Sequence, residues 1–303
     1  MADRDEGAGG RHRASGEATG AGEVVTVEEE FEQVQRQWRR RLAGRIGLVA
    51  AVSVGVLVAA RFLGFDLAYL YAHRQNLLDV LFGEMLAPEA LWAQLQGDGP
   101  MLASAAVETL AIAAVGTALG LPVALLLGVL AANTVTPPTV RTPLRLLLGG
   151  LRAVPSMVYA LLFVILAGLG AVAGALAIAI GTIGDLGRLF ADEMEEIDET
   201  PVEAVQSTGA GMVSTTAAAR LPQVVSAYVA WTLFYLEINA RKSSVLGIVG
   251  AGGLGFPLIM AFRARNYTRV MAVVLTILVL VVSVETVANW LRGRLKDDRR
   301  ADR

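Results

Sequence analysis

Three polar residues near position 240 could take part in chemistry within an otherwise apolar stretch: Glu237, Asn239 and Arg241. Glu237 and Arg241 are four positions apart, so a helix places them on one face, where they could pair rather than stand alone in lipid. Asn239 lies on a different face and could hydrogen-bond across an interface. One interpretation is a satisfied ion pair that fixes the helix end. The other is that they border a substrate path, because an arginine fork recognises oxyanion groups bidentately.

A glycine-rich segment, residues 244–255, follows this trio. Gly250, Gly252 and Gly255 have the spacing G-x-G-x-x-G, and Gly253 lies among them. A dinucleotide site would need a strand before the glycines, an amphipathic helix after them, and an acidic residue about twenty positions further on. Instead, a continuous apolar stretch follows, and the next carboxylate is Glu285. We therefore expect irregular backbone that is buried in protein or lines a cavity at membrane depth, and no nucleotide site.

The other reactive residue types are too few for catalysis. Cysteine is absent, and the two histidines, His12 and His73, lie outside the dense apolar stretches, which argues against a zinc site or a histidine-based triad. Neither lysine, Lys242 or Lys296, follows a glycine as the Walker A motif requires. We predict that the chain is not an enzyme and holds no metal or cofactor, and that any ATP-driven work depends on ATP bound by a partner subunit. The net charge of −2 argues against nucleic acid as a partner.

A short segment of polar and small residues, 200–222, is set between long apolar stretches. Its features in order are Glu203 and Ala204, then Gly209, then Leu221 and Pro222. This layout predicts a helix, a sharp turn that glycine permits, a second short helix, and a long helix that begins at the proline. The segment is either an ordinary connector between membrane spans or a docking surface for a partner protein.

The stretches that hold these residues predict an all-α integral membrane protein with about six transmembrane helices. Hydrophobic residues make up 54% of the 303 positions, and lipid requires every backbone polar group to be satisfied within helices. The predicted spans are residues 46–63, 101–132, 146–169, 175–190, 223–240 and 270–291. The second span is dense in small residues at intervals of three and four, which suits close helix packing.

The segments between the spans predict an orientation in the cell membrane. We expect a disordered or amphipathic basic cytoplasmic tail at 1–45, a first transmembrane helix at 46–64, and an external loop at 65–100. A core at 101–291, with a cytoplasmic loop at 191–222, precedes a basic cytoplasmic tail at 292–303. Both termini are then cytoplasmic. The basic residues that this topology places outside, against the positive-inside tendency, are Arg241, Lys242, Arg263, Arg265 and Arg269. Either the topology differs there or these charges have a task that faces outward.

The motifs together resemble a known family. Residues 200–222 are similar to the E-A-A-x3-G-x9-I-x-L-P cytoplasmic loop of ABC-importer permeases, with Val205 and Ala219 as departures from the pattern. The run FYLEINARKSSVLGIVGAGGLGF resembles phosphonate-type permeases, as do LRAVPSMVYALLFV and ETLAIAAVGTALGLP. The resemblance covers about residues 101–291. The glycine loop alone is shared with methionine-type permeases, and the Glu-Ile-Asn-x-Arg lead-in favours the phosphonate type.

The resemblance implies a fold, partners and a substrate. The fold would be the type I ABC importer permease core, and the partners an ABC ATPase subunit, an extracytoplasmic substrate-binding protein, a second permease copy in a homodimer, and membrane lipid. The ATPase-docking residues would be Glu203, Ala204, Gly209, Leu221 and Pro222. The substrate-pathway residues would be Glu237, Asn239, Arg241, Gly250, Gly252, Gly253 and Gly255. The substrate would be phosphonate or a related phosphorus oxyanion, with methionine, phosphate or another small solute as the alternative. A non-ABC channel would leave the docking spacing unexplained, and an intramembrane enzyme would concentrate reactive residues at one depth.

Overall fold

The structure is a computed structural model that describes residues 27–301, and each element within this range is helical. The predicted disordered segment before Val27 lies outside the described residues. The chain divides into two units at His73. In the first unit, α1 (Val27–Phe62) is one 36-residue helix that contains the predicted first span. α2 (Leu67–Ala72) follows, and Asp66 caps it by accepting from the backbone N–H of Ala68 at 2.8 Å.

Residues 65–100, expected to form a loop, are largely helical. Besides α2, they contain α3 (Arg74–Leu78), the π-helix η1 (Asp79–Met85) and the start of α4 (Pro88–Ala131). α4 begins at Pro88 because proline is favoured at the first position of a helix, where its missing N–H costs nothing. Asp98, one of the acidic residues that suggested a loop, instead lies in α4, where it accepts a hydrogen bond from Gln94 Nε2 at 2.6 Å.

α4 and α7 (Ala171–Glu195) form the centre of the second unit. Three glycines of α4 face α7 so closely that a Cβ atom on any of them would lie 2.6–2.7 Å from α7 atoms: Gly116, Gly120 and Gly128. The small-residue pattern of the second predicted span thus allows the two backbones to approach. Fully buried Ile178, Leu186 and Phe190 fill the space between α7 and its neighbours.

The third predicted span, 146–169, is not one straight helix. It is divided between α5 (Pro138–Ala153) and α6 (Ser156–Ala167), whose axes differ by 85°. The break falls at Val154, which is extended with φ −90° and ψ 122°. Pro155 causes it, because the proline ring excludes helical backbone at the preceding residue and removes one N–H.

The C-terminal half of the second unit contains α10 (Leu221–Leu246), η3 (Gly247–Val249), α11 (Gly255–Arg263) and α12 (Tyr267–Ala301). α10 continues past the predicted end at 240. Arg241 and Lys242 therefore lie within a helix, not in an outer loop, and Lys242 reaches Asp185 of α7.

Among the described residues, four helices are long and apolar enough to cross a membrane, and the bent pair α5–α6 would make a fifth. The four are Trp38–Phe62, Pro88–Ala131, Ala171–Glu195 and Tyr267–Arg294. α10, counted among the six predicted spans, is 26 residues long but carries Glu237, Asn239, Arg241 and Lys242, which lower its hydropathy.

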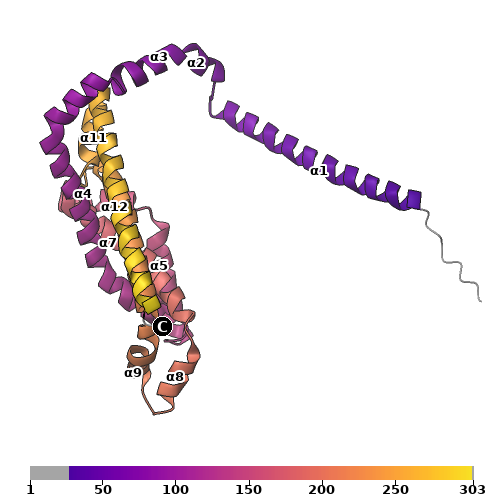
Figure 1. Ribbon diagram of the computed structural model, residues 1–303, viewed down its shortest axis with the longest axis vertical. Helices are drawn as coiled ribbons and strands as arrows, with labels where there is room; N and C mark the ends of the chain where they lie inside the picture. Colours follow the sequence, from indigo (N-terminus) through magenta and orange to yellow (C-terminus); the bar gives the residue numbers. More distant parts are fainter. Residues whose placement is uncertain (1–26, 302–303) are drawn as a thin grey trace, which may run out of the picture. The chain divides into compact units, whose positions relative to one another are not determined.

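Three short helices connect α7 to α10: α8 (Glu199–Gln206), α9 (Met212–Thr215) and the π-helix η2 (Thr216–Arg220). α8 and α9 extend from the end of the second unit opposite α11 (Figure 1). Two hydrogen bonds hold the helices beside them together. Tyr228 Oη donates to the Phe190 carbonyl at 2.7 Å, and Trp231 Nε1 donates to Glu193 Oε1 at 2.7 Å. The connector is therefore mounted on two helices that are tied to each other.

Candidate functional site

The connector between α7 and α10 has the predicted order of helix, glycine turn, short helix and proline start. Asp198 caps α8 by accepting from the Thr200 N–H at 2.9 Å. This bond lowers the pKa of the Asp198 carboxyl below its usual value, because the N–H favours the charged form. α8 ends in a turn in which Gly209 has φ +83° and donates its N–H to the Gln206 carbonyl at 2.9 Å. Only glycine adopts this left-handed conformation without strain, which explains its place in the motif.

The connector is anchored on one side and free on the other. Val202 is buried, whereas Glu203, Ala204 and Gly209 are exposed. Met212 and Val213 are also exposed, at 49% and 75%. We call the exposed residues Glu203, Ala204, Gly209, Met212 and Val213 the α8–α9 surface. Of the two remaining predicted docking residues, Pro222 is exposed and Leu221 is half-buried at the start of α10. The α8–α9 surface therefore presents two apolar side chains and a carboxylate on the side of the connector that is not buried.

Gln223, which the sequence motif did not single out, fixes the base of the connector. Its Oε1 accepts from the Asp198 N–H at 3.0 Å, and its Nε2 donates to the Asp198 carbonyl at 3.1 Å. Nε2 also donates to the Ala219 carbonyl at 2.8 Å. The side-chain amide therefore joins the start of α8 to the start of α10. The only sequence signal for it was an amide directly after the Leu-Pro pair.

A second polar residue at this base was also missed. Arg220 is 5% exposed, and its Nη1 donates to Thr216 Oγ1 at 3.2 Å. Ala219, one of the two departures from the family pattern, is buried beside it. η2 therefore buries Thr216, Ala219 and Arg220, while the residues of the α8–α9 surface are exposed.

The glycine loop adopts the irregular backbone expected of it. Gly250, Gly252 and Gly253 have φ values of 89°, 82° and 67°, which favour glycine. The loop is held from two sides: the Leu254 N–H donates to Thr109 Oγ1 of α4 at 2.9 Å, and the Gly170 N–H donates to the Gly250 carbonyl at 2.9 Å. Gly255 is buried, and a Cβ there would lie 2.6 Å from the Ser244 carbonyl oxygen. These glycines let the loop fold tightly against its neighbours.

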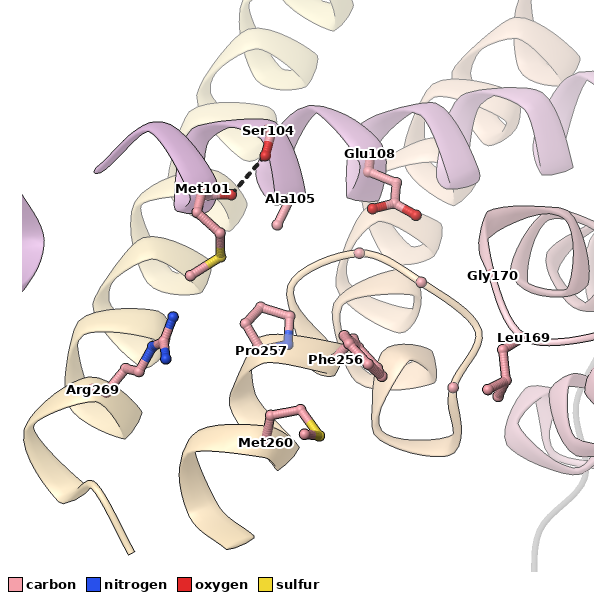
Figure 2. Close-up of a pocket in the computed structure, with 13 residues that line it drawn as sticks. Met101, Ser104, Ala105, Glu108, Leu169, Gly170, Phe256, Pro257, Met260 and Arg269 are labelled. Atoms are coloured by element: carbon pink, nitrogen blue, oxygen red, sulfur yellow. Dashed lines mark hydrogen bonds between the residues drawn. The ribbon is translucent and has the colours of Figure 1, made fainter. Parts of the chain in front are cut away.

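The glycine loop lines a cavity of about 480 Å³. Figure 2 shows the Glu108 carboxylate directed toward the loop and Arg269 at the other end of the cavity. A Cβ on Gly252 would lie 2.6 Å from Glu108 Oε1 and 2.9 Å from the backbone nitrogen of Ala171, so the loop packs closely against both. Arg269 pairs with Asp98 at 2.8 Å. Met101, Phe256 and Met260 are among the apolar lining residues.

The structure separates the polar trio on α10. Asn239 is 1% exposed, and its Nδ2 donates to Thr117 Oγ1 at 2.9 Å and Thr182 Oγ1 at 3.0 Å. It therefore ties α10 to both α4 and α7. Glu237 is buried and pairs with Arg241 at 3.5 Å, as its spacing predicted, and with Arg292 of α12 at 3.1 Å. Neither Asn239 nor Glu237 lines the cavity of the glycine loop, so the predicted pathway residues do not form one cluster.

Arg241 instead lines a second cavity, of about 530 Å³, together with Arg152, Asp185 and Lys242. Asp185 accepts both neighbouring cations: Lys242 Nζ lies 3.0 Å from Oδ2, and Arg152 Nε lies 3.5 Å from Oδ1. The sequence placed Arg152 near a helix end and Lys242 in a loop, and it gave no sign that they meet. Among the described residues, no group of three His, Cys, Asp or Glu side chains could hold a metal ion.

Comparison with known proteins gives three kinds of match. The family described as binding-protein-dependent transport system inner membrane component matches residues 124–297. The phosphate-import permease protein PhnE of Mycolicibacterium smegmatis is 44% identical over 198 residues, which are 65% of this chain but only 37% of that protein. The phosphite transport system permease protein PtxC of Stutzerimonas stutzeri is 33% identical over 273 residues, covering 88% of this chain and 96% of that protein.

Solved structures support the same fold. An inward-facing structure of the MetNI methionine ABC transporter contains a chain that matches with a TM-score of 0.56 and 22% identity. The match covers 65% of this chain and 98% of that chain. At this identity the likeness concerns the fold alone, and it confirms the predicted type I importer core.

Proposed function

The chain belongs to the family of binding-protein-dependent transport system inner membrane components, and we propose that it is the permease of an ATP-driven importer for phosphonate or a related phosphorus oxyanion. As a multi-pass membrane component of a transport system, it is not itself an enzyme. The relatives named for phosphate and phosphite import support the substrate class. So does the Glu-Ile-Asn-x-Arg lead-in to the glycine loop.

The observation that carries the proposal is the projecting α8–α9 surface. In the proposed complex an ATPase subunit docks there, with Glu203, Ala204 and Gly209 in contact and with Leu221 and Pro222 at the root of α10. Met212 and Val213 add apolar contact, being exposed at 49% and 75%. Because Gln223 joins both ends of the connector, a movement of the docked ATPase would be transmitted to α10 as a rigid-body movement.

Coupling in this proposal is mechanical. ATP is bound and hydrolysed by the separate subunit, and the permease alternates between states open to either side. A second copy of the chain completes the pathway, and an extracytoplasmic binding protein delivers the anion. Both termini of the chain are cytoplasmic, and lipid surrounds the exposed apolar helices. The α8–α9 surface is then on the cytoplasmic side.

The proposed substrate pathway runs along α10 toward the glycine loop. Glu237 and Arg241 border it, and Asn239 holds α4, α7 and α10 around it through its bonds to two threonines. Gly250, Gly252, Gly253 and Gly255 form its outer end, where their close packing leaves a loop that can change conformation as a unit.

The test is ATPase stimulation in the reconstituted complex of permease, ATPase and binding protein. We expect stimulation with a binding protein loaded with methylphosphonate or phosphite, and none with a methionine-loaded protein. ATPase stimulation only by the methionine-loaded binding protein would contradict the phosphorus oxyanion as substrate and favour methionine. A permease that binds no ATPase would contradict the docking assignment. So would ATPase binding that stays unchanged when residues of the α8–α9 surface are replaced by glutamate or arginine.

A further inference from the structure

The cavity at the break between α5 and α6 has the composition of an anion site. Its polar lining comes from four charged side chains and one hydroxyl: Arg152, Asp185, Arg241, Lys242 and Ser156. Three of the charges are positive and one is negative. A cavity inside a membrane bundle rarely carries such an excess, because an uncompensated charge in low dielectric is costly.

The pairing pattern extends this excess along α10. Asp185 is shared by Lys242 and Arg152, at 3.0 and 3.5 Å. Glu237 is shared in the same way by Arg292 and Arg241, at 3.1 and 3.5 Å. Four cations thus share two carboxylates, which leaves two positive charges without a carboxylate of their own. A phosphonate or phosphate dianion carries the charge that would balance them.

The three cations that line the cavity keep N–H donors that their carboxylate partners do not occupy. The side chains of Arg152 and Arg241 remain 53% and 54% exposed, and that of Lys242 remains 31% exposed. The distances from Arg152 to Asp185 and from Arg241 to Glu237 are both 3.5 Å, longer than a charge-assisted hydrogen bond of about 2.8 Å. Each guanidinium can therefore turn a fork of N–H groups toward an oxyanion without giving up a short bond.

The helix break adds a further attraction at the same place. α6 begins at Ser156, its N-cap residue is Pro155, and no side chain caps its first N–H groups. Ser156 and Pro155 both line the cavity. The positive end of a helix of 12 residues thus adjoins the three cations. α6 is about 18 Å long, which is shorter than a hydrocarbon layer about 30 Å thick.

Resting on the proposed function, we propose that this cavity is the oxyanion subsite of the transport path. Arg152, Arg241 and Lys242 would bind the oxygens of a phosphorus dianion beside the start of α6. Asp185 holds Lys242 and Arg152 in position when the site is empty. The subsite is distinct from the glycine-loop cavity, whose charged lining residues are Glu108 and Arg269.

Lysine labelling tests occupancy directly, because the chain contains only Lys242 and Lys296. The complete complex would be acylated with an amine-reactive reagent, without nucleotide and with a non-hydrolysed ATP analogue, and each lysine quantified by mass spectrometry. We expect methylphosphonate and inorganic phosphate to slow labelling of Lys242 but not of Lys296, with L-methionine protecting neither. Unchanged Lys242 labelling in both nucleotide states would overturn the subsite.

Neutral substitutions test transport through the subsite. In proteoliposomes we expect Arg152→Gln and Lys242→Gln each to lower methylphosphonate uptake about tenfold or more, the factor that corresponds to losing one charge-assisted contact. Lys242→Arg should retain most of the uptake. Arg188→Gln is the matched control, because Arg188 is likewise in an ion pair, with Asp192 at 3.8 Å, but does not line this cavity.

A readout on the ATPase separates this proposal from the proposed function. The ATPase subunit should still co-purify with Arg152→Gln and Lys242→Gln, since the α8–α9 surface is intact. Normal uptake in both variants, with a wild-type complex that transports methylphosphonate, would overturn the subsite while leaving the importer. A wild-type complex that is neither stimulated by nor transports any phosphorus oxyanion would overturn the proposed function itself.

Discussion

Replacing Gln223 by leucine should loosen the connector without altering the bundle. The side-chain amide makes three hydrogen bonds, to the Asp198 N–H, the Asp198 carbonyl and the Ala219 carbonyl. Leucine has a similar volume but can make none of them. Each net hydrogen bond contributes roughly 0.5–1.5 kcal/mol. Because the two bonds to Asp198 are exposed to water, the low end applies, and we expect the connector to lose about 1.5 kcal/mol of local stability.

This loss of local stability should change both amide exchange and affinity for the ATPase subunit by a measurable factor. About 1.4 kcal/mol corresponds to a factor of ten in an equilibrium constant, so amide exchange in residues 199–213 of Gln223→Leu should be about tenfold faster. Affinity for the ATPase subunit should fall by a similar factor, because the α8–α9 surface must then be ordered on binding. Hydrogen exchange with mass spectrometry measures the first, and a binding titration in detergent measures the second.

The matched control is Gln96→Leu, the same substitution at an exposed position of α4. It should change neither quantity. If Gln223→Leu leaves exchange in 199–213 and ATPase affinity at wild-type values, the amide does not hold the connector, and the rigid-body coupling inferred from it fails. If α4 and α7 also exchange faster, the variant has destabilised the whole bundle and the local argument is wrong.

Three further substitutions probe the connector and the bundle. Gly209→Val should destabilise the left-handed turn by about 1–2 kcal/mol and lower the ratio of anion transported to ATP hydrolysed. An unchanged ratio would contradict the role of Gly209 in docking. Asn239→Leu, which deletes the bonds to two threonines, should lower stability by about 1–2 kcal/mol, seen as a lower Tm in detergent; an unchanged Tm would mean that the tie is not stabilising. The folded pKa of Asp198 is depressed, so its capping contribution is present above the usual value of 3.8 and lost as pH falls through the lower folded pKa. Exchange at the start of α8, corrected for intrinsic rates, should therefore rise below about pH 4 in the wild type but not in Asp198→Asn, whose cap does not titrate; equal profiles would rule out the carboxylate as the cap.

The local features of this protein were predictable from the sequence. The Glu237–Arg241 pair follows from a spacing of four on a helix. The turn at Gly209 and the helix start at Leu221 and Pro222 follow from the conformational preferences of glycine and proline. The irregular loop at Gly250–Gly253 follows from its composition in the same way. In each case the information lies within a few residues along the chain.

Other expectations failed or were incomplete because the deciding partner is distant in sequence. Composition predicted a loop at 65–100, but most of this segment is helical, and Asp98 pairs there with Arg269 of α12. The third span was predicted as one segment, 146–169, whereas the structure breaks it at Val154 and Pro155 into α5 and α6. The angle of 85° depends on how α5 and α6 pack against α7.

Local sequence features were enough to predict the all-α membrane fold class and the individual turns, since hydrophobic periodicity and turn residues act locally. The family was predicted from the resemblance of its motifs. The tertiary structure decided which charges meet. Asp185 joins Lys242, 57 positions away, and Asn239 joins Thr117, 122 positions away. These pairs form because close packing of α4, α7 and α10 brings their polar side chains to the same depth, where an unpaired polar group is costly. The spacing of residues along one helix does not predict which polar side chains of other helices lie at the same depth.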